Sequence, residues 1–234
     1  MAETKKERWY REVKEYWDES LFKCADMVQS HYTTSRIDIK ETFVFLSELY
    51  DSNPFSNNDD NTADEKIEFK LRKDCVLDAG SGTGRLTRKF NKYFQTIDVL
   101  DQSSKYVKTA WNSIGDEFRG LCFEGDIQDF VPIKDRYGLI WVQYVLGHLY
   151  DEEDLLRFLF NFRNGLSQDS LMVIKEKCSY EGYYCLKKHC YIFRPAFYYK
   201  GLFLRAGFAM YKEQIYNTRE HVVRTFALKK VSLF

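Results

Sequence analysis

The chain has 234 residues, of which 44% are hydrophobic and 17% aromatic, which is enough material for one globular domain with a short extension. Lys plus Arg number 35 and Asp plus Glu number 35, so the formal net charge is zero. This balance argues against a protein that binds nucleic acid or a membrane surface through a strong overall positive charge. No direct nucleic-acid partner and no membrane are therefore expected.

The cysteines and the first residues indicate the compartment. None of the six cysteines forms a C-x-x-C pair, and the small cluster of Cys185, His189 and Cys190 lacks a second half, so no metal site is expected. The opening MAETKKERWY has no apolar core of a secretory signal, and no stretch reaches transmembrane length. Reduced thiols without an export signal predict a cytoplasmic or nuclear protein, and we expect a monomer.

Residues 1–66 predict a helical extension followed by a polar loop. Between residues 3 and 22, apolar side chains recur at spacings of three and four, which is typical of one face of a helix. A second helix is expected over Ile39 to Tyr50. The stretch DSNPFSNNDDNTADE that follows is polar and aperiodic, which indicates an exposed or disordered linker.

Residues 67–234 predict one α/β unit. Strands are expected in CVLDAG, TIDVLD, LCFEGDIQDF, GLIWVQYVL and SLMVIKEK. Helices are expected in GRLTRKFNKYF, SSKYVKTAWNSI, DEEDLLRFLFNFRNGL and PAFYYKGLFLRAG, the last opened by Pro195 and closed at Gly207. Two last strands, FAMYKEQIY and VVRTFALKK, should form an antiparallel hairpin. The alternation predicts a Rossmann-like, seven-stranded, mostly parallel sheet covered by helices on both faces.

A glycine loop follows the first strand in LDAGSGTGR, at Gly80, Gly82 and Gly84. Glycines at the carboxyl end of a parallel strand permit positive φ and let a ligand approach the backbone. A dinucleotide fingerprint needs a small residue where Arg85 stands, and a P-loop needs Gly-Lys-Ser/Thr, so both are excluded. The G-x-G-x-G form resembles motif I of class I S-adenosylmethionine (SAM) methyltransferases; a glycine-rich turn without ligand is the alternative.

Acidic residues end the next two strands. Asp101 closes TIDVLD, where a carboxylate can accept hydrogen bonds from both hydroxyls of a ribose. The alternative is a helix N-cap, a role that Ser103 or Ser104 could equally serve. The segment 126–129 follows the third strand, where this class usually contacts adenine.

A wider set of motifs is more specific. LDAGSGTGR, DIQDF, IWVQYVLGHLYDEEDL and VIKE, with YW and SRIDIKETFVFL upstream, resemble the eukaryotic protein α-N-terminal methyltransferases of the Xaa-Pro-Lys type. That resemblance extends from about Trp9 to the end and implies SAM as cofactor, S-adenosylhomocysteine as product and a protein or peptide N-terminus as substrate. It implies that Arg85 pairs with the cofactor carboxylate and Gln143 with its methionine end. The candidate cofactor residues are Trp17, Asp78, Gly80, Gly82, Gly84, Arg85, Asp101, Gln102, Asp126, Ile127, Gln128 and Gln143.

His148 lies in WVQYVLGHL, at the exit of the fourth strand, and falls on the active-site His of that family. An α-amino group has a pKa of about 7.7–8.0, so it must lose a proton before it attacks a sulfonium methyl group. A nearby base removes that proton, and His has a suitable pKa. The resemblance thus implies a catalytic His148; a helix-entry residue is the alternative.

The match breaks after the fifth strand. The family holds the substrate's amine and its Lys there with an Asn and acidic residues; here Lys177 stands at the Asn position, and residues 186–191 contain Lys187 and Lys188. A cationic substrate should be repelled, so the site's mouth should be less acidic than the family's. SLFKCADMVQSHYTT also replaces the family's Gly-rich loop. The candidate substrate residues are Tyr32, Asp38, Trp141, Tyr144, Glu176, Lys177 and His189.

Three functions remain open at this point. The first is a divergent α-N-terminal methyltransferase of proteins. The second is a SAM methyltransferase whose substrate has changed to a less basic N-terminus or an anionic molecule. The third is an inactive homologue that serves as a binding or regulatory subunit. The intact glycine loop and Asp101 weigh against the third.

Overall fold

The computed structural model describes residues 3–51, 71–217 and 222–231, without side-chain detail for residues 20–36 and 51. The expected polar linker and the boundary near residue 66 lie outside these residues. The helices are α1 (Lys5–Asp51), α2 (Ser104–Asn112), α3 (Glu152–Gly165) and α4 (Ala196–Arg205), with short 3-10 helices η1 (Thr87–Lys92), η2 (Asp116–Phe118), η3 (Leu146–His148) and η4 (Lys187–His189). The strands are β1 (Cys75–Ala79), β2 (Thr96–Asp101), β3 (Arg119–Glu124), β4 (Tyr137–Gln143), β5 (Leu166–Ser179), β6 (Tyr184–Leu186), β7 (Tyr191–Pro195), β8 (Phe208–Asn217) and β9 (Val222–Lys230).

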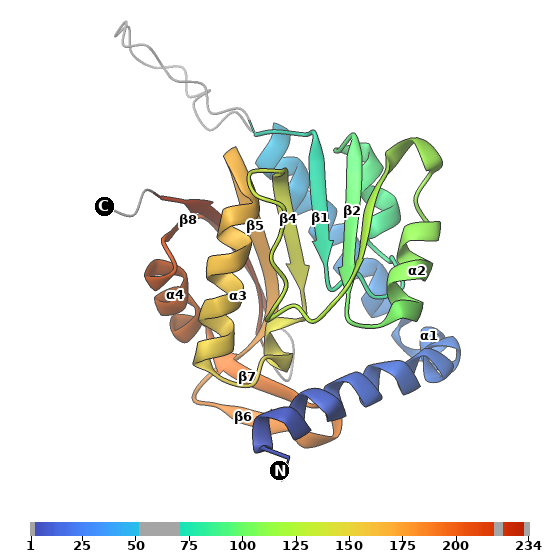
Figure 1. Ribbon diagram of the computed structural model, residues 1–234, viewed down its shortest axis with the longest axis vertical. Helices are drawn as coiled ribbons and strands as arrows, with labels where there is room; N and C mark the ends of the chain where they lie inside the picture. The colour runs from blue at the N-terminus through green and yellow to red at the C-terminus, as the bar shows by residue number, and fades with distance from the viewer. Residues whose placement is uncertain (1–2, 52–70, 218–221, 232–234) are drawn as a thin grey trace, which may run out of the picture.

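These strands form one sheet (Figure 1). Its order is β3-β2-β1-β4-β5-β7-β6, and β9 also pairs with β5 and with β8. The five strands β1 to β5 run parallel to their neighbours in this order, while β9 is antiparallel to both β5 and β8. The mostly parallel sheet with a C-terminal antiparallel hairpin is confirmed.

Three local predictions differ from the structure. The described sheet has nine strands, whereas seven were expected. The two additional strands, β6 and β7, are short. The stretch GRLTRKFNKYF forms only the 3-10 helix η1, since the chain after the glycine loop turns before a regular helix is established. The two N-terminal helices are one element, α1, that extends from Lys5 to Asp51. Pro195 stands at the N-cap of α4, as expected.

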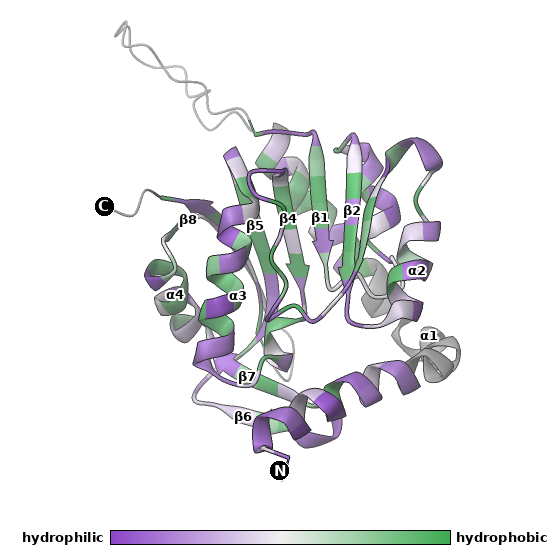
Figure 2. Cartoon of the chain, viewed as in Figure 1, coloured by the Kyte–Doolittle hydropathy of each residue, from purple (hydrophilic) through white to green (hydrophobic). Residues whose placement is uncertain are grey.

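Two apolar layers enclose the sheet (Figure 2). Side chains of β1 and β4 alternate between them, because successive residues of a strand point to opposite faces. Leu77 and Ile140 pack against α3 and α4, whereas Val76 and Leu139 pack against α2, η1 and the C-terminal part of α1. The central strands are buried on both faces, as strands of a parallel sheet usually are.

The two ends of α1 serve different parts of the molecule. Near its C-terminus, Phe45, Leu46 and Leu49 are buried in the core. Residues near its N-terminus lie across the carboxyl ends of the strands (Figure 1). In the described part of the chain, no helix has the length and apolar character needed to cross a membrane.

Candidate active site

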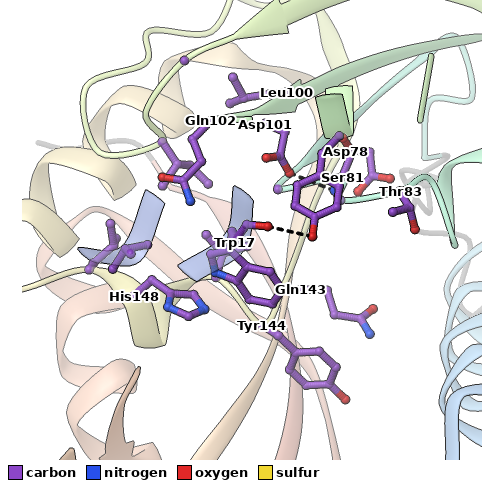
Figure 3. Close-up of a pocket in the computed structure, with 18 of the residues that line it drawn as sticks. Trp17, Asp78, Ser81, Thr83, Leu100, Asp101, Gln102, Gln143, Tyr144 and His148 are labelled. Atoms are coloured by element: carbon purple, nitrogen blue, oxygen red, sulfur yellow. Dashed lines mark hydrogen bonds between the residues drawn. The ribbon is translucent and has the colours of Figure 1, made fainter. Parts of the chain in front are cut away.

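A cavity of about 330 Å³ lies between the carboxyl ends of β1, β2 and β4 and the N-terminal part of α1. Ligands in open α/β sheets bind at this edge, where neighbouring crossovers diverge. Its walls are mainly apolar, with polar groups at the strand ends (Figure 3). The lining residues are Tyr10, Val13, Trp17, Asp78, Gly80, Ser81, Gly82, Thr83, Arg85, Leu86, Leu100, Asp101, Gln102, Tyr106, Gly125, Ile127, Gln128, Gln143, Tyr144, Val145, His148 and Leu149.

The glycine loop leaves room for a ligand against its backbone. Gly80 has φ +79°, and a Cβ atom there would come within 2.4 Å of Val145. Gly82 has φ +53°, and a Cβ atom there would meet nothing within 4 Å, because that position opens into the cavity. Gly84 instead packs against Ala110 of α2 and does not line the cavity.

Asp101 is held in place by the backbone. One carboxylate oxygen accepts from Gly82 N at 2.9 Å, and the other accepts from Ser103 N at 3.0 Å. Burial raises its pKa. The residue that precedes α2 as N-cap is Ser103, so capping does not account for Asp101. It offers a half-buried carboxylate to hydroxyl donors in the cavity.

Asp78 lines the same cavity but is more deeply buried than Asp101. Burial raises its pKa to about 7, although the Thr87 hydroxyl donates to it at 2.5 Å and favours the ionised form. A carboxyl group with this pKa can be either protonated or ionised near neutrality, so a positively charged ligand would stabilise its ionised form.

Trp17 covers the cavity from α1. Its ring packs edge-on against the His148 ring, with centroids 5.4 Å apart, and its backbone oxygen accepts from the Tyr106 hydroxyl at 3.0 Å (Figure 3). Two neighbours fix the helix on either side: Ser103 donates to Asp18 at 2.6 Å, and Trp9 Nε1 donates to the His148 carbonyl at 2.7 Å.

His148 is buried at the other end of the cavity. Its Nδ1 lies 2.8 Å from the Cys190 carbonyl oxygen, which can only accept, so Nδ1 carries the proton and Nε2 is the basic nitrogen. Nε2 is buried and has no hydrogen-bond partner among the described residues. Burial lowers the pKa of His148 to about 4, so the ring stays neutral. Asp151 caps α3, which removes the helix-entry role from His148.

Glu176 fixes the turn that carries His148. One of its carboxylate oxygens accepts from Leu146 N at 2.8 Å and from Gly147 N at 3.3 Å. The other accepts from Lys177 N at 2.8 Å and from the Tyr191 hydroxyl. Burial raises the pKa of Glu176. The side chain was a candidate substrate contact, but it does not line the cavity and holds backbone instead.

Arg194 holds the same turn through its backbone carbonyl groups. Its guanidinium, almost fully buried, donates to the carbonyls of Leu146 at 3.1 Å, Leu149 at 2.6 Å and Tyr150 at 3.1 Å. The planar fork of Arg suits several acceptors at once. Sequence reasoning missed Arg194, since nothing in YIFRPAF marks a buried cation.

Asp38 lies behind the cavity wall. It forms ion pairs with Lys175 at 2.6 Å and Arg85 at 2.7 Å. It also accepts from Gln143 Nε2 at 2.9 Å and from the Tyr144 hydroxyl at 2.8 Å. Burial alone would raise its pKa, but the two cations outweigh burial and lower it. Asp38 thus orients three cavity residues and is not itself part of the lining.

The remaining predicted residues divide into two groups. Gln102, Ile127 and Gln128 line the cavity, as expected of cofactor contacts. Four others do not: Asp126, Trp141, which is buried in the core, Lys177 and His189. The side chain of Tyr32 lies outside the described residues. Tyr10 and Val13 were missed, although they share the helical face of Trp17 by their spacing.

The cavity fits S-adenosylmethionine. The loop at Gly82 leaves its backbone open to a ligand, and the half-buried carboxylate of Asp101 lines the cavity at a strand end, where this class of fold binds ribose hydroxyls. The fold and this site define a class I SAM-dependent methyltransferase.

The comparisons with known proteins identify the family. The family model of AdoMet-dependent proline dimethyltransferases matches residues 5–229, so the chain belongs to that family. It is 30% identical over 224 residues to N-terminal Xaa-Pro-Lys N-methyltransferase 1 of Danio rerio, with 94% of each chain covered. It is 29% identical to α N-terminal protein methyltransferase 1 of Arabidopsis thaliana, with 90% of this chain and 74% of that protein covered.

Solved structures agree in fold. A SAM-dependent methyltransferase of Leishmania major has a TM-score of 0.78 at 20% identity, with 94% of this chain and 83% of that chain covered. The 1,6-didemethyltoxoflavin-N1-methyltransferase of Burkholderia thailandensis, solved with S-adenosylhomocysteine, has a TM-score of 0.69 at 15% identity, with 99% and 93% covered. The class I methyltransferase fold is therefore confirmed.

Proposed function

We propose that this enzyme transfers methyl groups from SAM to the free α-amino group of a protein N-terminus. The observation that carries this proposal is the neutral His148, whose unprotonated Nε2 is buried without a described partner at the end of the cavity. Buried nitrogens without partners are rare, and this one suits an N–H donor. The names of the relatives support the same substrate group.

The amine must be neutral when it reacts, because a protonated amine has no lone pair. The Cys190 carbonyl keeps the proton of His148 on Nδ1, so Nε2 can accept a hydrogen bond or a proton from the amine. The low pKa of His148, about 4, makes it a weak base in the empty cavity. It therefore acts by accepting a hydrogen bond from the neutral amine, which orients the lone pair; transfer of the methyl group gives a methylammonium and S-adenosylhomocysteine, and the ammonium loses its proton to solvent after release.

Positioning provides the rest of the rate. Bound SAM supplies an electrophilic methyl group on a sulfonium. Asp101 and the glycine loop line the cofactor end of the cavity, while the ring of Trp17 packs edge-on against His148 (Figure 3). Holding two reactants in line is worth about 7–11 kcal/mol of barrier in favourable cases, which leaves His148 a modest share.

The proposal is tested with synthetic peptides and mass spectrometry. A free-amine peptide should gain methyl groups at its N-terminal nitrogen, and the same peptide with an acetylated N-terminus should gain none. Methylation that falls only on side chains, or only on a molecule that is not a peptide, would refute the proposal. His148→Asn keeps the size and polarity of the side chain and should abolish most turnover.

We also propose that the enzyme acts as a monomer in the cytoplasm or nucleus. The free thiols of Cys75, Cys122, Cys178, Cys185 and Cys190 support a reducing compartment. Size-exclusion chromatography with light scattering and imaging of a tagged protein test these two statements. A dimer that persists at nanomolar concentration would contradict the first, and secretion would contradict the second.

A further inference from the structure

The ammonium group of Lys177 lies beside the acceptor end of the cavity. Lys177 follows Glu176 near the end of β5, and its Nζ is 5.3 Å from the centroid of the Tyr144 ring. It is 6.0 Å from the centroid of the Tyr191 ring, which itself packs edge-on against His148 at 5.0 Å. Two aromatic faces thus hold one cation near the group that receives the amine, an arrangement that stabilises a positive charge.

No described carboxylate forms a direct ion pair with this ammonium. Within the described residues, Lys177 forms no ion pair. The adjacent Glu176 uses both carboxylate oxygens on backbone N–H groups and the Tyr191 hydroxyl, so neither oxygen pairs directly with the ammonium. Burial is the main cause of the low pKa of His148, and the charges of Lys177 and His189 lower it further. The charge of Lys177 therefore acts on the side chain that receives the amine.

The other acids in this region are paired or exposed. Asp38, which accepts from the Tyr144 hydroxyl, is paired with Lys175 and Arg85. Glu12 and Glu15 of α1 are exposed. Burial is the main cause of the raised pKa of the Cys190 thiol, and the charges of Glu12 and Glu15 raise it further, so these acids lie on the same side of the molecule. Water and salt screen exposed charges strongly, whereas a partly buried cation keeps more of its field. Lys177 is therefore a partly buried positive charge at the acceptor end of the described structure, and no described carboxylate pairs with it directly.

We propose that Lys177 selects the substrate by charge: it favours N-termini with an acidic side chain among their first three residues and disfavours those with Lys there. The inference rests on the proposed function, because it concerns a peptide whose α-amine lies at His148. A carboxylate on the peptide can pair with the ammonium held by Tyr144 and Tyr191. A second ammonium would be pushed away by it.

Three peptides test the proposal. They share the first two residues, Ala-Pro, and differ only in Lys, Gln or Glu at the third. With the wild-type enzyme, kcat/KM should rise from Lys to Gln to Glu, with about tenfold between the extremes, which corresponds to 1.4 kcal/mol. Higher salt should narrow this range, because the discrimination is electrostatic.

Two variants assign the effect to one residue. Lys177→Asn removes the ammonium at a half-exposed position. Without this charge, the ratio of kcat/KM between the Glu and Lys peptides should fall from about tenfold to about threefold or less. Lys92→Asn makes the same substitution at an exposed residue on η1 and should leave the wild-type preference unchanged. Thermal melting of both variants checks that the fold is intact.

The outcomes distinguish a failure of selection by Lys177 from a failure of the proposed methyl transfer to an N-terminus. Equal rates for the three peptides, a preference for Lys, or an unchanged preference in Lys177→Asn would overturn the role of Lys177 alone. If no free-amine peptide is methylated while calorimetry shows that SAM binds, the proposed function fails, and the selection by Lys177 fails with it.

Discussion

Replacing Glu176 by Gln tests whether the turn of His148 must be held for catalysis. The carboxylate receives N–H groups from Leu146, Gly147 and Lys177 and the hydroxyl of Tyr191, and the side chain is 0% exposed. An amide has only one oxygen, so its NH₂ group would face two of these donors. A buried donor without an acceptor costs about 1–3 kcal/mol, and two give a loss of about 2–6 kcal/mol in the free energy of unfolding.

The catalytic consequence is larger than the loss of stability alone would give. Because Leu146 and Gly147 immediately precede His148, a shift of the turn moves Nε2 away from the amine, and a misplacement of about 1 Å can cost about 100-fold in rate. We expect kcat to fall about 10–100-fold below the melting transition. The affinity for SAM, measured by calorimetry, should stay within about twofold, since Glu176 lies outside the cavity lining.

Two further variants make this result specific. Glu176→Asp keeps a carboxylate and should recover part of kcat. Glu213→Gln removes one charge from the ion pairs with Lys200 and Arg224, away from the cavity, and should lower stability without changing kcat. A Glu176→Gln enzyme that is less stable but turns over at the wild-type rate would refute the positioning of His148 by this carboxylate.

Three other outcomes follow from the site. Asp101→Asn should weaken SAM binding about 10–100-fold in calorimetry, because an amide cannot accept from both ribose hydroxyls and from Gly82 and Ser103; an unchanged affinity would remove the residue from the cofactor site. His148→Asn should lower kcat at least about 100-fold with SAM affinity unchanged, and a loss below about tenfold would exclude a role of His148 in catalysis. The pKa of His148 is lowered from 6.5 to about 4, so the stability due to its neutral form is present above pH 6.5 and is lost as the pH falls through 4. Between pH 6.5 and 4, the free energy of unfolding in urea should fall about 3 kcal/mol more for wild-type protein than for His148→Asn. Parallel pH curves for the two proteins would contradict the lowered pKa of His148.

The cofactor half of the site follows closely from local sequence. The glycine loop and Asp101 come directly after buried strands, and parallel strands bring their carboxyl ends to one edge, so the pattern alone places them together. Trp17 was also predicted, and Tyr10 and Val13 could have been, since they repeat its helical spacing. The positions of these side chains could be predicted because each follows from a pattern within a single segment of the chain.

The positioning residues depend on contacts between segments far apart in the chain. Nothing near Glu176 shows that it binds the backbone of residues 146 and 147, and nothing near Asp38 shows that Arg85 and Lys175 surround it. The strands β6 and β7 were missed for a related reason. β6 has three residues, all exposed, so it lacks the alternation that marks a half-buried strand.

The most direct test of the central claim is the site of methylation on a peptide. The enzyme is incubated with SAM and two peptides of one sequence, one with a free and one with an acetylated N-terminus, and fragment spectra locate the added methyl groups. The account requires methyl groups on the α-nitrogen of the free peptide and none on the acetylated one. Equal methylation of both peptides, or none on the free one with SAM bound, would contradict it.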